Sequence, residues 1–233
     1  MNIVKNLVSE SKYSVKCPYA MTPEFIVVHN TANDATAANE VKYMISNNNQ
    51  VSFHFAVDDK EVVQGLPLDR NAWACGDGAN GKGNRKGIQI EICYSKSGGA
   101  RFENAEKNAA KFIAQLLKER GWGVDKVKKH QDFSNKYCPH RTLDKGWASF
   151  VNMVKDYLNE LNKLVQVNQT KTFLVEIICN ELNIRQQADF NSKVVGTVKK
   201  GEVFTIVEEK NGLGKLKSGA GYISMNAKYV RRK

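Results

Sequence analysis

Residues 87–93 read Gly-Ile-Gln-Ile-Glu-Ile-Cys, with an isoleucine at every second position. This alternation is typical of a β-strand with one face directed at an apolar core, and we expect the segment to be a central strand. A carboxylate within such a strand is costly unless it faces a functional site. Glu91 is therefore either a site residue or the solvent-facing residue of an edge strand. The isoleucines on the opposite face favour the first interpretation.

Further strand and helix patterns surround this segment. The strand patterns cover residues 25–29, 51–57 and 61–64, and the helical patterns cover residues 37–48, 103–120 and about 146–164. Five glycines from Gly76 to Gly87 indicate a long exposed loop over residues 75–87. Strands mixed with helices of this length predict an α/β domain over residues 1–164, in which helices pack on a mixed sheet.

The pattern changes in the last third of the chain. Residues 165–172 are polar, have no helical period and are interpreted as a linker. Short strand candidates separated by glycine, asparagine and lysine turns then follow over residues 173–233, and they predict a small all-β barrel. A basic barrel of this size also fits an oligonucleotide-binding fold.

Net charge and cysteine content limit the kinds of binding partner and of covalent cross-link that we expect for this chain. The net charge is +11, and residues 170–233 carry twice as many basic as acidic residues. A basic surface attracts polyanions such as nucleic acid, acidic lipid or the anionic polymers of a bacterial wall, and charge alone does not choose among them. The five cysteines are odd in number and widely spaced, which favours free thiols or a metal ligand over a disulfide framework.

The N-terminal residues contain no long apolar segment. We therefore expect synthesis in the cytoplasm without a signal peptide. No apolar run approaches the roughly 20 residues that a membrane-spanning helix requires.

Two histidines and one cysteine are candidate metal ligands. His29 ends a strand pattern, and His130 and Cys138 lie within one short segment. A catalytic zinc site needs three protein ligands and an open position, and these residues would supply two imidazoles and a thiolate. Spacing alone leaves a second interpretation open, in which the histidines are structural and the cysteine is a small buried apolar residue.

Amide hydrolysis at a zinc ion also needs a general base and a donor for the developing oxyanion. Glu91 is the candidate base. Lys136 lies two residues before Cys138 and is either the oxyanion donor or a solvated loop lysine. Trp73 precedes the glycine-rich segment and is either a stacking surface for a sugar or peptide, or a core residue.

Five motifs of the first part resemble the zinc N-acetylmuramoyl-L-alanine amidases of phage endolysins, which are related to the peptidoglycan recognition proteins. The motifs are FIVVHNTA at 25–32, VSFHFAVDD at 51–59, NAWACGDG at 71–78, IQIEICYS at 88–95 and HQDFSNKYCPHR at 130–141. The resemblance implies roles for seven residues: His29, His130 and Cys138 as ligands of one zinc ion, Glu91 as general base, Lys136 as stabiliser of the tetrahedral intermediate, and His54 and Trp73 as lining of the substrate groove. Many relatives carry a histidine where this chain has Ala74, so the resemblance assigns no role to that position.

The tail resembles a bacterial SH3 domain of the type that binds cell walls. The matching segments are LNIR at 182–185, VVGTVKKGE at 194–202 and GYIS at 221–224. Two positions depart from the pattern. The proline that usually follows a few residues after the arginine of the LNIR segment is absent, and Ala188 stands nearby. The tryptophan that is usual before the fifth strand is replaced around Leu213 and Gly214.

The resemblances together imply an endolysin that hydrolyses the amide bond between N-acetylmuramic acid and L-alanine in the peptidoglycan of a Gram-positive host. We expect a monomer that is released through a phage-type membrane lesion, has no nucleic-acid or membrane partner, and also contacts anionic wall polymers. Three alternatives remain open. They are a non-catalytic peptidoglycan-binding protein, a zinc peptidoglycan endopeptidase, and a basic nucleic-acid-binding protein with a structural zinc.

Overall fold

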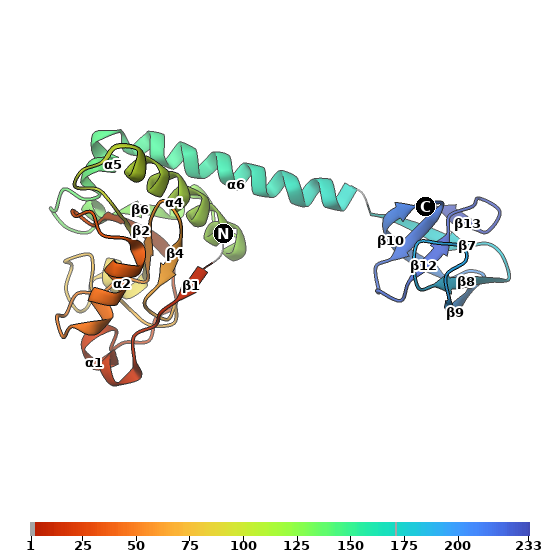
Figure 1. Cartoon of the computed structure of the whole chain (residues 1–233), viewed down its shortest axis with the longest axis horizontal. Helices are drawn as coiled ribbons and strands as arrows, with labels where there is room; N and C mark the ends of the chain where they lie inside the picture. Colours follow the sequence, from red (N-terminus) through yellow and green to blue (C-terminus); the bar gives the residue numbers. More distant parts are fainter. Residues whose placement is uncertain (1–2, 171) are drawn as a thin grey trace. The chain divides into compact units, whose positions relative to one another are not determined.

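The computed structural model describes residues 3–170 and 172–233, and residues 164–170 by their backbone alone. The chain divides into two compact units, Met1–Leu161 and Asn162–Lys233 (Figure 1). Each unit has its own cluster of buried apolar side chains.

The first unit is built on a six-stranded sheet with the strand order β1-β4-β3-β5-β2-β6. The strands are β1 (Ile3–Lys5), β2 (Phe25–Asn30), β3 (Phe55–Val57), β4 (Val62–Gln64), β5 (Gly87–Ile92) and β6 (Val127–Lys129). The pairs β3–β5, β5–β2, β2–β6 and β1–β4 are parallel, whereas β3 and β4 are antiparallel. The expected mixed sheet is therefore present, and β5 lies at its centre.

Helices surround this sheet. They are α1 (Tyr13–Lys16), α2 (Ala37–Ser46), α3 (Lys82–Lys86), α4 (Gly99–Arg120), α5 (His140–Asp144) and α6 (Trp147–Thr170), with short 3₁₀ turns η1 (Glu10–Lys12), η2 (Val124–Lys126) and η3 (His130–Asp132). The hydroxyl of Thr36 caps α2 by accepting from the amide of Asn39. Gly121, with a φ of 65°, ends α4 in the left-handed conformation that glycine adopts without strain.

Helix α4 packs on β5 and β3, so one face of β5 is directed at the apolar core and the other face away from it. Ile88, Ile90 and Ile92 are fully buried in the core. Burial of such a side chain stabilises the fold by about 2 kcal/mol. Since successive side chains of a strand alternate between faces, Gln89 and Glu91 lie on the opposite face of the sheet.

Two segments differ from the sequence-based expectation. The glycine-rich segment Cys75–Gly87 is folded rather than a long exposed loop, because it contains α3 and buries Cys75, Gly83 and Asn84. Helix α6 continues to Thr170 through most of the expected linker, and residue 171 lies outside the described residues. Once a helix has nucleated, each further residue adds a hydrogen bond, so polar residues extend it without an apolar stripe.

The second unit is a seven-stranded sheet in which all neighbouring strands are antiparallel. Its strands are β7 (Phe173–Ile177), β8 (Glu181–Arg185), β9 (Val194–Lys199), β10 (Val203–Lys210), β11 (Leu213–Leu216), β12 (Tyr222–Ser224) and β13 (Val230–Arg232). The expected all-β unit is therefore present.

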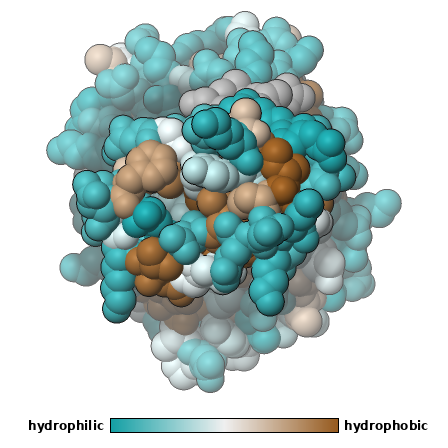
Figure 2. Space-filling model, turned by 90° about the vertical axis from the view of Figure 1, so that its right-hand side faces the viewer, coloured by the Kyte–Doolittle hydropathy of each residue, from teal (hydrophilic) through white to brown (hydrophobic). Residues whose placement is uncertain are grey.

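The surface of this unit carries several exposed apolar side chains. Figure 2 shows hydrophobic side chains gathered at the front among hydrophilic ones. The large apolar residues that are exposed in this unit are Leu174, Phe190, Val194, Val195, Val203 and Tyr229. Across the described part of the chain, no helix is both long enough and apolar enough to cross a bilayer.

Candidate active site

The side chains of His29, His130 and Cys138 converge at the carboxyl end of the sheet. Their ligand atoms all lie within 4.8 Å of one another, and all three residues are buried. His29 is in β2, and His130 directly follows β6, the parallel neighbour of β2. Because the ends of parallel neighbours meet at the same edge of a sheet, the fold brings together two histidines that are far apart in sequence.

The two imidazoles face each other through their Nδ1 atoms, which are 3.0 Å apart. The Nε2 atom of His29 lies 2.8 Å from Oε1 of Gln89, and the ring of His130 donates to the backbone carbonyl of Cys75. Burial, together with the charge that His130 would carry, lowers the pKa of His29 to about 3. Burial also lowers the pKa of His130. Both rings are therefore neutral near pH 7, which is the form that binds metals.

Cys138 completes the group. Its Sγ atom lies 4.0 Å from Nδ1 of His29. Burial and the nearby carboxyl of Glu91 raise the pKa of the thiol to about 11, while the backbone N–H of Asn30 acts in the opposite direction. The thiol keeps its proton near pH 7 unless a cation replaces it.

This donor set suits a zinc ion. Two imidazole nitrogens and one sulfur are ligands that zinc favours, and three protein ligands leave a fourth position open. Among the described residues, no further His, Cys, Asp or Glu belongs to the group. A closed structural site with four protein ligands of these types is therefore not formed.

Glu91 lies beside the cluster, since its Cα is paired with that of His29 across β5 and β2. Its Oε2 atom is buried and has no hydrogen-bond partner within the described residues. Burial and the charge of Glu40 raise the pKa of Glu91 to about 8, and Lys136 acts in the opposite direction. A carboxyl group that titrates in this range exchanges protons readily near neutral pH. The alternative of an exposed edge-strand glutamate does not apply, because β5 is central.

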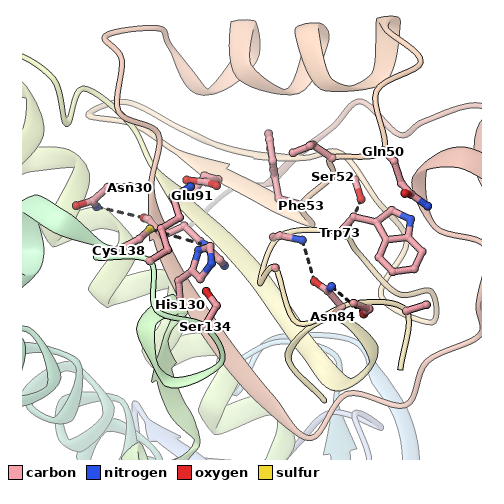
Figure 3. Close-up of a pocket in the computed structure, with 17 residues that line it drawn as sticks. Asn30, Gln50, Ser52, Phe53, Trp73, Asn84, Glu91, His130, Ser134 and Cys138 are labelled. Atoms are coloured by element: carbon pink, nitrogen blue, oxygen red, sulfur yellow. Dashed lines mark hydrogen bonds between the residues drawn. The ribbon is translucent and has the colours of Figure 1, made fainter. Parts of the chain in front are cut away.

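The cluster opens into a pocket of about 620 Å³. Figure 3 shows Glu91, His130 and Cys138 at one end and Trp73 with Gln50 at the other. The exposed Lys136 also lines the pocket. Trp73 is half-buried in the wall, and its backbone amide donates to Oγ of Ser52.

His54 is the one sequence-predicted site residue that the structure does not bring to this pocket. Its side chain is fully buried, its Nε2 donates to the backbone carbonyl of Arg70, and its Nδ1 accepts from the backbone amide of Gln89. Both ring nitrogens are thus used to join segments of the backbone. The neighbouring Ser52 and Phe53 line the pocket in its place.

The sequence interpretation missed several pocket or cluster residues, among them Asn84, Ser134 and Gln89. Asn84 accepts from the backbone amides of Ala74 and Cys75 and so shapes the wall. Ser134 lines the pocket with an Oγ atom that is buried and has no hydrogen-bond partner in the described part of the chain. Gln89 contacts His29. The alternation that singled out Glu91 applies equally to Gln89, whereas no sequence signal distinguishes Asn84 or Ser134.

Comparison with known proteins gives a consistent result for both units. Residues 19–141 match the family described as N-acetylmuramoyl-L-alanine amidase, and residues 180–230 match the bacterial SH3 domain. Among curated proteins, the N-acetylmuramoyl-L-alanine amidase XlyB of Bacillus subtilis (strain 168) is 64% identical over 158 residues, which cover 67% of this chain and 50% of XlyB. The amidase CwlA of the same strain is 61% identical over 162 residues, covering 69% of this chain and 60% of CwlA.

Solved structures agree with these matches. PlyL is 58% identical with a TM-score of 0.64, and the match covers 66% of this chain and 97% of PlyL. The PlyG catalytic domain is 58% identical with a TM-score of 0.65, covering 68% of this chain and 96% of that domain. The chain spans about half of XlyB and 60% of the Bacillus subtilis CwlA. On the match over residues 19–141 and these identities, the chain belongs to the N-acetylmuramoyl-L-alanine amidase family.

Proposed function

We propose that this protein hydrolyses the amide bond between N-acetylmuramic acid and L-alanine in bacterial peptidoglycan, with one zinc ion bound by His29, His130 and Cys138. The observation that carries the proposal is the cluster of three ligand atoms within 4.8 Å, with Glu91 paired to His29 beside it and a pocket in front of both. A bound zinc ion supplies a water of lowered pKa and polarises the scissile carbonyl.

The side chains of this chain carry the proton transfers and the charge stabilisation. Glu91 accepts a proton from the attacking water and delivers it to the departing amine of alanine. Its buried, unpartnered oxygen and raised pKa support both steps. Lys136 donates to the oxyanion of the tetrahedral state, a role supported by its position in the pocket lining. Trp73 contributes an aromatic surface to the wall for a sugar or peptide group.

The second unit binds the wall and keeps the catalytic unit near its substrate. Linking two weak contacts raises the overall affinity without a new contact in either site. Its match to the bacterial SH3 domain supports this role, and its basic surface suits the anionic polymers of a Gram-positive wall. We further propose that the protein works as a monomeric endolysin that reaches the wall through a phage-type membrane lesion.

The proposal is tested by digesting purified peptidoglycan and identifying the new amino termini. Alanine as the new amino terminus, formed with zinc and lost after its removal by a chelator, is the expected result. A different amino-terminal residue indicates a zinc endopeptidase. Binding to peptidoglycan without any new amino terminus indicates a non-catalytic binding protein, and both of these results contradict the proposal.

A further inference from the structure

The amide of Gln89 has a fixed orientation. Its Nε2 donates to two backbone carbonyls, those of Gly83 at 2.6 Å and Gly87 at 3.0 Å. A carbonyl oxygen only accepts, so the NH₂ group has to point at these two residues. The Oε1 atom is thereby directed away from them and toward Nε2 of His29, at 2.8 Å.

This orientation determines the tautomer of His29. An amide oxygen only accepts, so Nε2 of His29 carries the proton. In a neutral ring the other nitrogen, Nδ1, then holds the lone pair. Nδ1 is the atom that faces His130, and it lies 4.0 Å from Sγ of Cys138.

The glycine-rich segment Cys75–Gly87 supplies the two backbone carbonyls that hold this amide. A Cβ at Gly87 would lie 2.8 Å from Nε2 of Gln89 and 2.6 Å from Cγ2 of Val27. A Cβ at Gly83 would lie 2.7 Å from Cβ of Cys75. Real Cβ atoms do not approach this closely, so both positions need glycine for the backbone to reach the amide. Asp77 holds the segment by accepting from the backbone amide of Gly83.

The same segment also contacts the second imidazole. The thiol of Cys75 donates to Oε1 of Gln89 at 3.2 Å, and the backbone carbonyl of Cys75 accepts from the ring of His130. One folded segment therefore supplies, directly or through Gln89, a partner for each of the two histidines.

We infer that Gln89, held by the segment Cys75–Gly87, is a positioning residue that presents Nδ1 of His29 to the zinc ion. The inference rests on the proposed zinc site. Partners of this kind fix ligand orientation and tautomer, and their loss costs roughly 10- to 100-fold in metal affinity. The glycines of the segment then serve the metal site as well as the fold.

Two variants of the full chain, each with one glutamine replaced by methionine, test this role. Gln89→Met keeps the length of the side chain but removes both the donor and the acceptor. Gln64→Met is the matched control, because Gln64 is also buried in the sheet and its Nε2 donates to the carbonyl of Leu66, away from the cluster. The measurements are the zinc dissociation constant, by competition with a chromophoric chelator, and the visible absorption spectrum of the cobalt-substituted protein.

We expect Gln89→Met to bind zinc roughly 10- to 100-fold more weakly and to change the cobalt spectrum. Gln64→Met should match the wild type in both, even if both variants lose thermal stability. Wild-type zinc affinity and an unchanged cobalt spectrum in Gln89→Met would overturn the inference. A wild-type protein that binds no zinc would instead contradict the proposed function.

A measurement on the wild-type protein tests the inference even if the Gln89→Met variant does not fold. Nitrogen-15 NMR of the metal-free wild-type chain near pH 7 reports which ring nitrogen of His29 carries the proton. A proton on Nε2 is the expected result. A proton on Nδ1 alone means that Gln89 does not set the tautomer, and the inference then fails whatever the zinc affinity.

Discussion

The Nδ1 atoms of His29 and His130 lie 3.0 Å apart, and Nε2 on the other side of the His29 ring lies 2.8 Å from Oε1 of Gln89. Nδ1 of His29 therefore presents its lone pair to the ring of His130 in a buried site. A cation between the rings would be bound by both when His130 also presents a lone pair there, and the sulfur of Cys138, 4.0 Å from Nδ1 of His29, is placed to share that cation.

Zinc should therefore stabilise the folded protein. A ligand that binds only the native state at about 1,000 times its dissociation constant adds about 4 kcal/mol, which raises the melting temperature of a domain of this size by roughly 10 °C. Thermal unfolding of the chelator-treated chain, before and after zinc is restored, measures this difference. His130→Ala is the control and should show a much smaller shift. Equal melting temperatures of the wild type with and without zinc would contradict a native-state zinc site.

Replacement of Glu91 should separate chemistry from metal binding. Glu91→Gln keeps the size of the side chain and removes its capacity to accept a proton. Loss of a general base lowers the rate by roughly 10²- to 10⁴-fold. We expect one zinc ion per chain, by elemental analysis, together with this loss of amide cleavage. Turnover close to wild type would exclude Glu91 as the base, and loss of zinc would show that it supports the metal site instead.

Lys136→Ala should reduce kcat far more than it changes KM. Removal of one oxyanion donor in comparable sites costs roughly 10²- to 10³-fold in kcat. Because Lys136 is exposed, the melting temperature should stay near that of the wild type. Steady-state kinetics on soluble peptidoglycan fragments measure the two constants, with Lys82→Ala as the control for an exposed lysine of the same unit. An unchanged kcat rules out the assigned role.

Much of the fold was predictable from local sequence patterns, and strand β5 shows why. Alternation along residues 87–93 depends only on the strand period, and it correctly indicated that Ile88, Ile90 and Ile92 face the core. The convergence of His29, His130 and Cys138 was expected from the motifs and is present in the structure.

Features that depend on partners distant in sequence were not predictable in the same way. His54 was assigned to the groove, but its environment is set by the backbone of Arg70 and Gln89, which only the folded sheet brings near it. The glycines of Cys75–Gly87 indicated a loop because glycine permits both an exposed turn and a close backbone approach. The approach of Gly83 and Gly87 to the Gln89 amide appears only in three dimensions.

Deletion of residues 170–233 should weaken lysis of whole cells more than cleavage of purified peptidoglycan. The catalytic unit has its own core and matches the isolated PlyG catalytic domain over 96% of that domain, so the deletion should leave it folded. On intact cells, however, the truncated protein loses the second contact that keeps it near the wall. The decrease in turbidity of a cell suspension is compared with the release of amino groups from purified peptidoglycan. A similar loss on both substrates would argue against a targeting role for the second unit.

His54 should make the stability of the fold sensitive to mild acid. Burial lowers the pKa of His54 to about 4 from its ordinary value of 6.5. Because the unfolded chain binds this proton more tightly, the stabilisation is complete above pH 6.5 and is lost as the pH falls from 6.5 to 4. The linkage amounts to about 3 kcal/mol. The hydrogen bonds of the neutral ring to Arg70 and Gln89 give the structural cause, since a protonated Nδ1 no longer accepts.

Urea unfolding of the wild type and of His54→Gln across this pH range, both with zinc in excess, tests this contribution. The variant should be less stable near neutral pH, because glutamine does not reproduce both ring contacts. The advantage of the wild type should then shrink by about 3 kcal/mol as the pH approaches 4, since only the wild type carries the group that takes up the proton. Acid release of zinc affects both proteins and cancels in the difference. Two stability curves that stay parallel over the range would mean that His54 is not held neutral by the fold.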